Sequence, residues 1–146
     1  MDLDKFGNIY ASSNHDGSKG YIAKVNPSTG AVIAKTTSHS GNMRALGVAC
    51  RENDVIYIQR GYTILSAQLL ERYDFSGSST SLTWSVSISK NRYTVFFVHP
   101  ETGDVYYGDR SRNRVYQVEA DTGQSAYWTV SSGYVYGGSV LRYPYV

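Results

Sequence analysis

Hydrophobic and polar residues alternate along much of this chain with a period of two, which predicts strands rather than helices. Such strands are expected at residues 21–25, 69–73 and 114–118. Two further segments, 45–49 and 93–98, are apolar on both faces of a strand, a pattern that suits strands covered on both sides. We therefore expect fully buried inner strands at residues 46–49 and 95–98.

The order of these segments recurs about three times. Each copy opens on an acidic or amide residue followed by an apolar pair, and these triplets lie 46 and 50 residues apart: Asn8-Ile9-Tyr10, Asp54-Val55-Ile56 and Asp104-Val105-Tyr106. Each copy continues with a half-buried strand, a polar turn that contains glycine, and a last strand at residues 31–37, 82–89 or 125–131. The second of these last strands has polar residues at alternate positions, Thr83, Ser85, Ser87 and Ser89.

Four strands in about 48 residues is the size of a β-propeller blade. The chain is therefore expected to be all-β, with about three four-stranded blades in a single domain of residues 1–146. The expected repeats are residues 1–43, 44–92 and 93–137, and residues 138–146 form an extra inner strand. A β-sandwich or another stack of eleven or twelve strands is the alternative, and the single repeated strand order argues against it.

The segments 4–10, 25–30 and 99–106 resemble blades of the NHL, PQQ-like and SMP-30-like propellers. The resemblance covers nearly the whole chain. It implies a fold and no particular chemistry, because these turns recur in propellers with unrelated activities.

Three blades are too few to close a ring, since propellers have about four to eight. Residues 1–3 correspond to the tail of an inner strand, and residues 138–143 look like an inner strand with no blade after it. The last strand would then complete the first blade of a second subunit, so that two chains form a six-bladed ring. The candidate assembly residues are Val140, Leu141, Tyr143 and Tyr145. The alternatives are a segment of a longer propeller, or one of several chains in a larger assembly.

Composition removes several classes of function. The net charge of +2, without a basic run, gives no reason to expect nucleic acid as a partner. Cys50 is the single cysteine, which rules out an intrachain disulfide and a Cys-x-x-Cys zinc site. The sequence contains no run of about 18 apolar residues and does not begin like a secretory signal, so we expect a soluble chain with no membrane span.

In a propeller, the loops between second and third strands share one face with the loops between blades. The candidate ligand-binding residues lie on these loops: His15, Asp16, His39, Arg60, Tyr62, Arg92, Arg110 and Arg112. Arg, His and Tyr suit an anionic or carbohydrate ligand. The same residues also fit ordinary solvated turns.

No arrangement of residues predicts catalysis. The inner strands carry Ala49, Cys50 and Phe96 where a metal-dependent propeller needs His, Asp or Glu, and the sequence contains no Gly-x-Ser-x-Gly motif. We therefore expect no catalytic centre, no metal and no cofactor.

The sequence favours a non-enzymatic module for assembly or recognition, such as a structural component of a phage tail or virion. One alternative is a lectin-like propeller that binds carbohydrate. The other is a hydrolase or lyase with its site in the central channel, which would need two or more ionisable groups near the axis.

Overall fold

The computed structural model describes residues 1–4, 6–15, 19–36, 44–52, 55–63, 66–91, 96–99, 101–109 and 112–131. All helical or extended elements within these residues are strands, so the all-β prediction is confirmed. None of these segments forms a helix with the length and hydropathy needed to cross a membrane.

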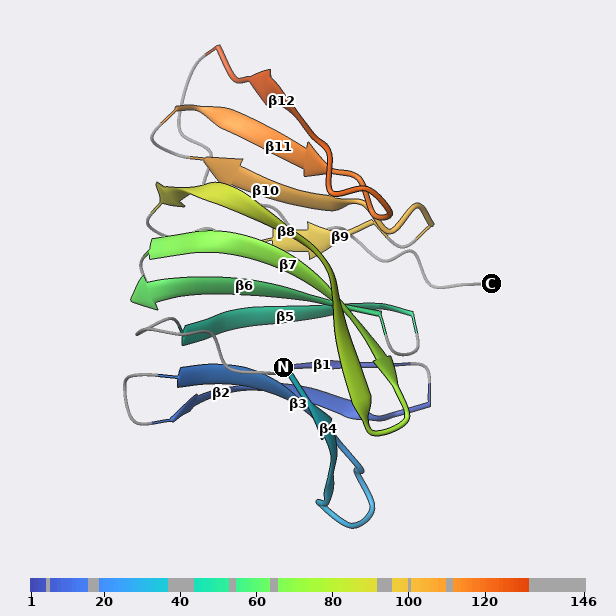
Figure 1. Cartoon of the computed structure of the whole chain (residues 1–146). Helices are drawn as coiled ribbons and strands as arrows, with labels where there is room; N and C mark the ends of the chain where they lie inside the picture. The colour runs from blue at the N-terminus through green and yellow to red at the C-terminus, as the bar shows by residue number, and fades with distance from the viewer. Residues whose placement is uncertain are drawn as a thin grey trace.

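The described residues form three four-stranded antiparallel sheets. The first sheet contains β1 (Asp2–Leu3), β2 (Ile9–His15), β3 (Lys19–Val25) and β4 (Val32–Lys35). The second contains β5 (Arg44–Glu52), β6 (Val55–Thr63), β7 (Ser66–Ser76) and β8 (Ser79–Asn91). The third contains β9 (Phe96–Val98), β10 (Val105–Asp109), β11 (Arg114–Val118) and β12 (Ser125–Thr129). Strands pair in chain order within each sheet, and the sheets are stacked on one another (Figure 1).

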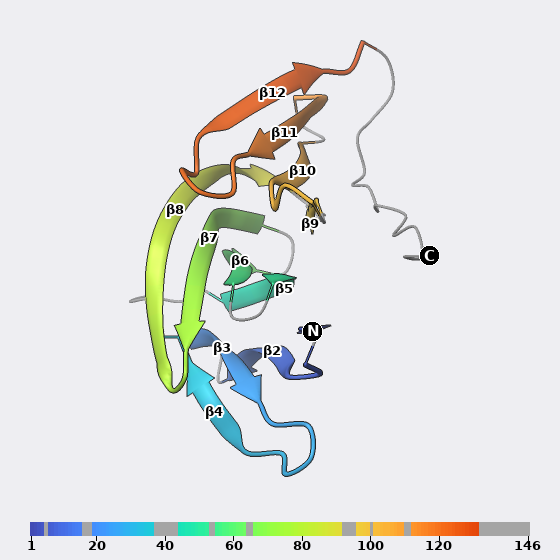
Figure 2. The same cartoon turned by 90° about the vertical axis from the view of Figure 1, so that its right-hand side faces the viewer.

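The sheets follow one another in chain order through the stack, with the second sheet in the middle. In Figure 2, β5, β9 and the N-terminus lie on one side of the stack, and β4 and β8 lie on the other. Each sheet therefore has a back face, directed toward the preceding sheet, and a front face, directed toward the following one. The back face of the first sheet and the front face of the third are the two end faces of the stack.

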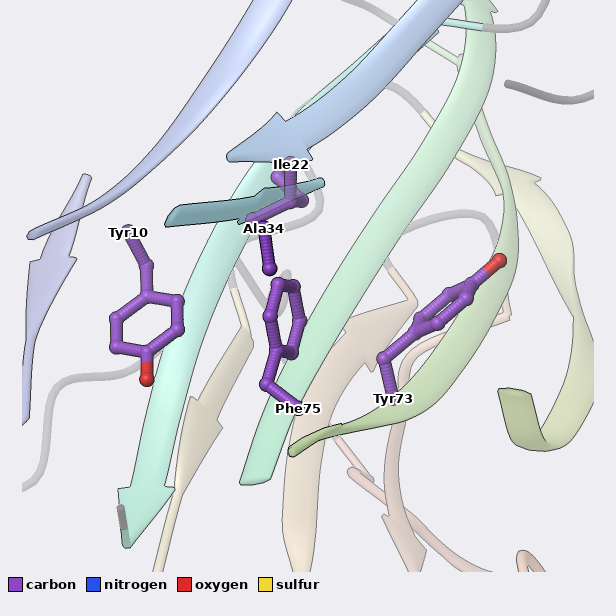
Figure 3. Packing of buried hydrophobic residues seen from close by; sticks show 5 residues of the cluster. All are labelled: Tyr10, Ile22, Ala34, Tyr73 and Phe75. Carbon is purple, nitrogen blue, oxygen red and sulfur yellow. The ribbon is translucent and has the colours of Figure 1, made fainter. Parts of the chain in front are cut away.

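The first core lies between the first and second sheets. Tyr10, Ile22 and Ala34 come from the front of the first sheet, and Tyr73 and Phe75 come from the back of the second (Figure 3). The rings of Tyr10 and Phe75 meet edge to face, with centroids 5.5 Å apart and planes at 85°. This is a preferred geometry for aromatic pairs.

The second core joins the second sheet to the third. Leu70 and Ile88 on the front of the second sheet pack against Val105, Tyr107 and Val118 on the back of the third. Each of these side chains is 5% exposed or less. The two cores therefore repeat one arrangement, in which the front of one sheet covers the back of the next.

The prediction of a fully buried strand at residues 95–98 is wrong. Phe96, Phe97 and Val98 are half-buried. The reason is that, among the described strands, β9 is the edge of its sheet and pairs with β10 alone. Val95 and the side chains of residues 46–49 lie outside the described part, so the matching prediction for the second copy stays open.

Strand pairing also shifts the predicted repeat by one residue in the second copy. Ile9 pairs with Val25 and Val105 pairs with Val118. The residue that pairs with Tyr73 is Ile56, so Ile56 rather than Val55 corresponds to Ile9 and Val105. A shift of one residue moves every side chain of a strand to the opposite face. The corrected triplet is Val55-Ile56-Tyr57, which aligns Tyr57 with Tyr10 and Tyr106.

The predicted polar alternation in β8 is confirmed where side chains are described. Ser85 and Ser87 are exposed, whereas Trp84 and Val86 are half-buried and Ile88 is buried. The buried positions of β8 are those that contact the third sheet.

Candidate functional site

Three turns at one rim of the stack share a backbone geometry. In each, a glycine N–H donates to the carbonyl oxygen four residues earlier: Gly30 to Asn26, Gly103 to His99 and Gly123 to Glu119, at 2.9 to 3.0 Å. These glycines have φ between 72° and 75°, in the left-handed region. The threonine before each glycine accepts a bond at Oγ1 from the backbone N–H two residues later. The turns of Gly30 and Gly123 join the third and fourth strands of their sheets, whereas the turn of Gly103 joins the first and second strands of the third sheet.

His99 belongs to one of these turns. Its Nδ1 accepts hydrogen bonds from the backbone N–H groups of Glu101 and Thr102, both at 3.3 Å. Asn26 makes the same kind of contact in the first sheet, where its Oδ1 accepts from Ser28 and Thr29. His99 therefore acts as a turn residue in this structure.

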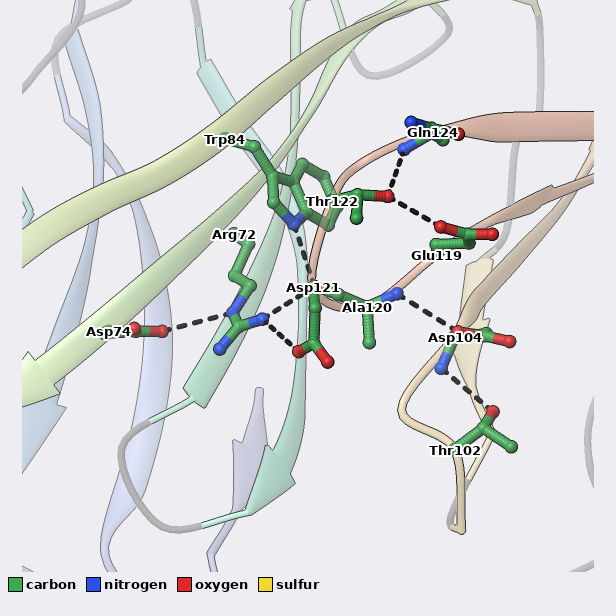
Figure 4. Close-up of polar contacts among 10 residues, drawn as sticks. All are labelled: Arg72, Asp74, Trp84, Thr102, Asp104, Glu119, Ala120, Asp121, Thr122 and Gln124. Atoms are coloured by element: carbon green, nitrogen blue, oxygen red, sulfur yellow. Dashed lines mark hydrogen bonds and ion pairs between the residues drawn. The ribbon is translucent and has the colours of Figure 1, made fainter.

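The turn of residues 119–124 is bound by the second sheet through a set of polar contacts (Figure 4). Arg72 Nη1 donates to the carbonyl oxygen of Ala120 at 2.7 Å and to Asp121 Oδ1 at 2.9 Å. Trp84 Nε1 donates to the same Ala120 oxygen at 2.9 Å. Arg72 Nε also binds Asp74 Oδ1 at 3.2 Å, which holds the guanidinium from within its own sheet. Side chains on the front of the second sheet thus hydrogen-bond to the turn at the rim of the third.

Residues of the third sheet itself also hold this turn. Asp104 Oδ1 accepts from the backbone N–H of Ala120 at 3.1 Å, and Asp104 Oδ2 accepts from Gln117 Nε2 at 2.7 Å.

Trp84 of the second sheet also packs closely over Gly123, where a Cβ would lie 3.0 Å from the indole carbons Cγ and Cδ2. The absence of a side chain at Gly123 is what allows this approach.

The back face of the first sheet carries an apolar row with exposed residues at its two ends. Leu3 pairs with Ile9, and Ile9 pairs with Val25. Leu3 is 55% exposed, and Ile9 and Val25 are half-buried. Val32, the strand partner of Val25 in β4, is 58% exposed.

The front face of the third sheet is aromatic. The Tyr106 ring stacks on Phe97 at 5.2 Å and on Trp128 at 6.5 Å, with interplanar angles of 8° and 13°. Trp128 is 51% exposed. Burial and the negative charge of Asp104 raise the pKa of Tyr106, so this phenol is uncharged at neutral pH. This end face therefore presents a stack of nearly parallel aromatic rings.

Of the eight candidate ligand-binding residues, one has a described side chain. Arg112 is exposed, and its Nη1 donates to Oδ2 of the fully buried Asp109 at 3.0 Å. The backbone N–H of Arg112 also donates to Asp109 Oδ1 at 3.2 Å. Arg112 is thus held by its own turn.

The other candidates are placed in part or not at all. His15 ends β2, and Arg60 and Tyr62 lie in β6, where the structure describes their backbone alone. The remaining candidates lie outside the described residues: Asp16, His39, Arg92, Arg110, Val140, Leu141, Tyr143 and Tyr145. Within the described segments, no three His, Cys, Asp or Glu side chains form a group that could hold a metal ion.

Sequence reasoning missed the contacts that Arg72, Asp104 and Asp121 make between and within sheets. One signal could have indicated them, the repeated Thr-Gly pair at residues 29–30, 102–103 and 122–123. It marks turns of equal geometry, and the partners of one such turn suggest the partners of another. Against known proteins, the sequence matches no family model, and it has no significant match among curated proteins, so the end faces and the rim contacts are the features on which a function can be argued.

Proposed function

We propose that this chain is a non-enzymatic β-propeller module of three blades, and that it functions in assembly and recognition. The observation that carries the proposal is the pair of end faces. Within the chain, the front of one sheet packs on the back of the next. At each end of the stack the last face is apolar and includes exposed side chains, Leu3 and Val32 at one end and Trp128 at the other. Exposed apolar sheet faces of this kind promote association.

The form of the sheets supports a propeller. Each is a four-stranded meander whose strands pair in chain order, as in a propeller blade. The first strands β5 and β9 lie toward one side, and the last strands β4 and β8 of the first two sheets lie toward the other (Figure 2), as expected for blades around an axis. Three such units leave the ring open.

The polar groups support a structural role. Asp104 and Arg72 bind turn backbone, and Asp109 binds the turn that contains Arg112. In each case the charge is used to fix a turn. Turns fixed by hydrogen bonds and apolar end faces that can contact other chains suit a component of a larger particle, such as a phage tail or virion.

The test is the mass of the full chain in solution over a range of concentrations. We expect sedimentation equilibrium to give a mass above the 16.2 kDa of one chain, with dissociation on dilution. A folded monomer at all concentrations, with native near-UV circular dichroism and no bound partner, would contradict an assembly function.

Carbohydrate binding is the second candidate, and one observation favours it. The stacked rings of Phe97, Tyr106 and Trp128 form a planar aromatic surface that could pack against the C–H face of a sugar. Titration with oligosaccharides, followed by tryptophan fluorescence of the wild-type chain and of Trp128→Ser, tests it. Saturable quenching that disappears in the variant would support this candidate.

A further inference from the structure

We propose that a second copy of this chain covers both end faces. The front of the third sheet in each copy packs on the back of the first sheet in the other, so that six sheets form a closed ring. This inference rests on the proposed function and names the partner on which that function depends.

The back faces of the first and third sheets provide the first argument. In the third sheet, Val98, Val105 and Val118 pair across β9, β10 and β11. Val105 and Val118 are 0% exposed because the second sheet covers them, and Val98 packs at the edge of the same core.

Leu3, Ile9 and Val25 occupy the same pairing positions in β1, β2 and β3. They form an equally apolar triplet, and Leu3 at 55% exposure shows that it is not covered to the same extent. A front face like that of the second sheet is what covers the equivalent triplet within the chain.

The last strands provide the second argument. Trp84 of β8, on the front of the second sheet, packs over Gly123 of the next sheet. Trp128 of β12 lies on the front of the third sheet, as its stacking with Tyr106 shows, and is 51% exposed.

The matching glycine is on the first sheet. Gly30 follows Val25 by five residues, as Gly123 follows Val118, and it has the same turn and nearly the same φ, 72° against 73°. Apart from its two chain neighbours, no atom of the described residues lies within 4 Å of the position of a Cβ at Gly30. An exposed tryptophan and an open glycine turn are therefore present at opposite ends of one chain.

Strand pairing places Trp128 opposite Val115, three residues before Val118, as Val86 lies opposite Leu70, three residues before Tyr73. Val86 packs on the core at the back of the third sheet. In a second copy, Trp128 can therefore pack on the apolar back of the first sheet.

Symmetry then decides the number of chains. The described sheets of each chain leave one front and one back without a neighbouring sheet, so the contact between copies is head to tail and forms a ring if the rotation closes. Propellers close at about four to eight blades, and two chains of three sheets supply six.

The experiment uses one variant at each end face of the full chain, Leu3→Arg on the back and Trp128→Arg on the front. Both positions are about half exposed, so we expect the monomer to tolerate the substitutions. In a ring closed head to tail, either variant alone damages both contacts of its homodimer. We expect each to raise the dissociation constant by about 100-fold or more, as loss of an aromatic anchor does.

Mixing the two variants is the decisive step. A mixed dimer has one contact between wild-type Trp128 and wild-type Leu3, and one contact that is damaged on both sides. Native mass spectrometry distinguishes the two chains by mass. We expect mixed dimers at concentrations where each variant alone is monomeric, and none when the double variant is mixed with either.

The matched control is Leu82→Arg, which places the same charge on an exposed apolar residue of the middle sheet, 47% exposed. It should leave the dimer unchanged. If the circular dichroism spectrum shows that an arginine variant is unfolded, the test is repeated with neutral side chains, as Trp128→Gln and Val32→Gln.

The outcomes separate the inference from the proposed function. A dimer that is weakened by Trp128→Arg and unaffected by Leu3→Arg would be a symmetric, front-to-front dimer. That result would overturn the inference and leave the proposed function standing. The same holds for dimers that resist both variants, or that are not rescued by mixing. A wild-type chain that is a folded monomer without a partner, its end faces covered by its own remaining residues, overturns both.

Discussion

The indole Nε1 of Trp84 donates a 2.9 Å hydrogen bond to the carbonyl oxygen of Ala120, and Arg72 Nη1 donates to the same oxygen at 2.7 Å. Both donors belong to the second sheet and the acceptor belongs to the third. A single backbone carbonyl therefore fixes the relative position of two sheets at their rim.

Trp84→Phe removes one of these donors and retains an aromatic ring. We expect a loss of about 0.5–1.5 kcal/mol in the free energy of unfolding, because the carbonyl keeps Arg72 as a partner. In an Arg72→Leu background, the same substitution should cost more, since the buried oxygen then loses both donors. Urea denaturation of the four proteins measures this coupling, and additive effects would contradict it.

Gly123→Ala should destabilise the chain more than Gly7→Ala. Both glycines have positive φ, 73° and 79°, so the backbone strain is matched. The Cβ at position 123 would lie 3.0 Å from the Trp84 indole, whereas no atom of the described residues, chain neighbours aside, lies within 4 Å of the Cβ at position 7. We expect each variant to lose about 1 kcal/mol from strain and Gly123→Ala to lose about 1–3 kcal/mol more from overpacking.

The control for this difference is a cycle with Trp84→Ala. With the indole gone, Gly123→Ala and Gly7→Ala should cost the same. An excess cost at position 123 that survives the loss of Trp84 would show that another contact is responsible.

Much of the fold could be predicted from the sequence because strand alternation and turn glycines are local signals. The second strands at Ile9 and Val105 and the third strands ending at Val25 and Val118 are where the patterns place them. The one-residue error at Val55 arose because Val55 and Ile56 are both apolar and β-branched, so hydropathy alone does not distinguish their faces. Pairing with Tyr73 distinguishes them, and pairing is not local.

The candidate site was less predictable. The loops chosen from the sequence were rich in Arg and His, but charge composition does not reveal which partner a side chain has. Arg112 is held by Asp109 three residues away, whereas Arg72 reaches Asp121 across 49 residues. Which sheet faces lie at the ends depends on the order in which the sheets stack. That order is a property of the folded chain, and no local sequence signal reports it.

Arg72 and Asp121 form an ion pair whose partners should respond differently to substitution. The Asp121 side chain is 80% exposed and that of Arg72 is 12% exposed. Asp121→Ala should cost about 0.2–1 kcal/mol, and the cost should fall as salt is added. Arg72→Ala should cost about 1.5–3 kcal/mol with little salt dependence, because it also removes the bond to the Ala120 carbonyl. Urea denaturation at low and high ionic strength measures both, and equal costs would contradict this assignment.

Asp4 gives the chain a specific response to acid. It is 8% exposed, and its carboxylate accepts bonds from the backbone N–H groups of Phe6 and Asn8, both at 2.9 Å. Asn8 Nδ2 and the Tyr10 hydroxyl also donate to it, at 2.8 and 3.2 Å. Burial acts to raise the pKa of Asp4, but these hydrogen bonds outweigh it and hold the pKa below the ordinary value.

Because the folded pKa of Asp4 lies below the unfolded value, the folded state favours the ionised form. The resulting stability is present above about pH 3.9, the ordinary pKa of aspartate, and is lost as the pH falls through the folded pKa. Asp4→Asn should therefore lower the free energy of unfolding by about 1–3 kcal/mol at pH 7, and by less as the pH falls below 4. Chemical denaturation of both proteins between pH 7 and pH 2 measures the difference. The exposed carboxylate of Glu101 supplies the control, since Glu101→Gln should change the free energy by no more than about 0.5 kcal/mol at any pH. A wild-type advantage over Asp4→Asn that stays constant down to pH 2 would mean that the hydrogen bonds, and not the charge, account for the effect.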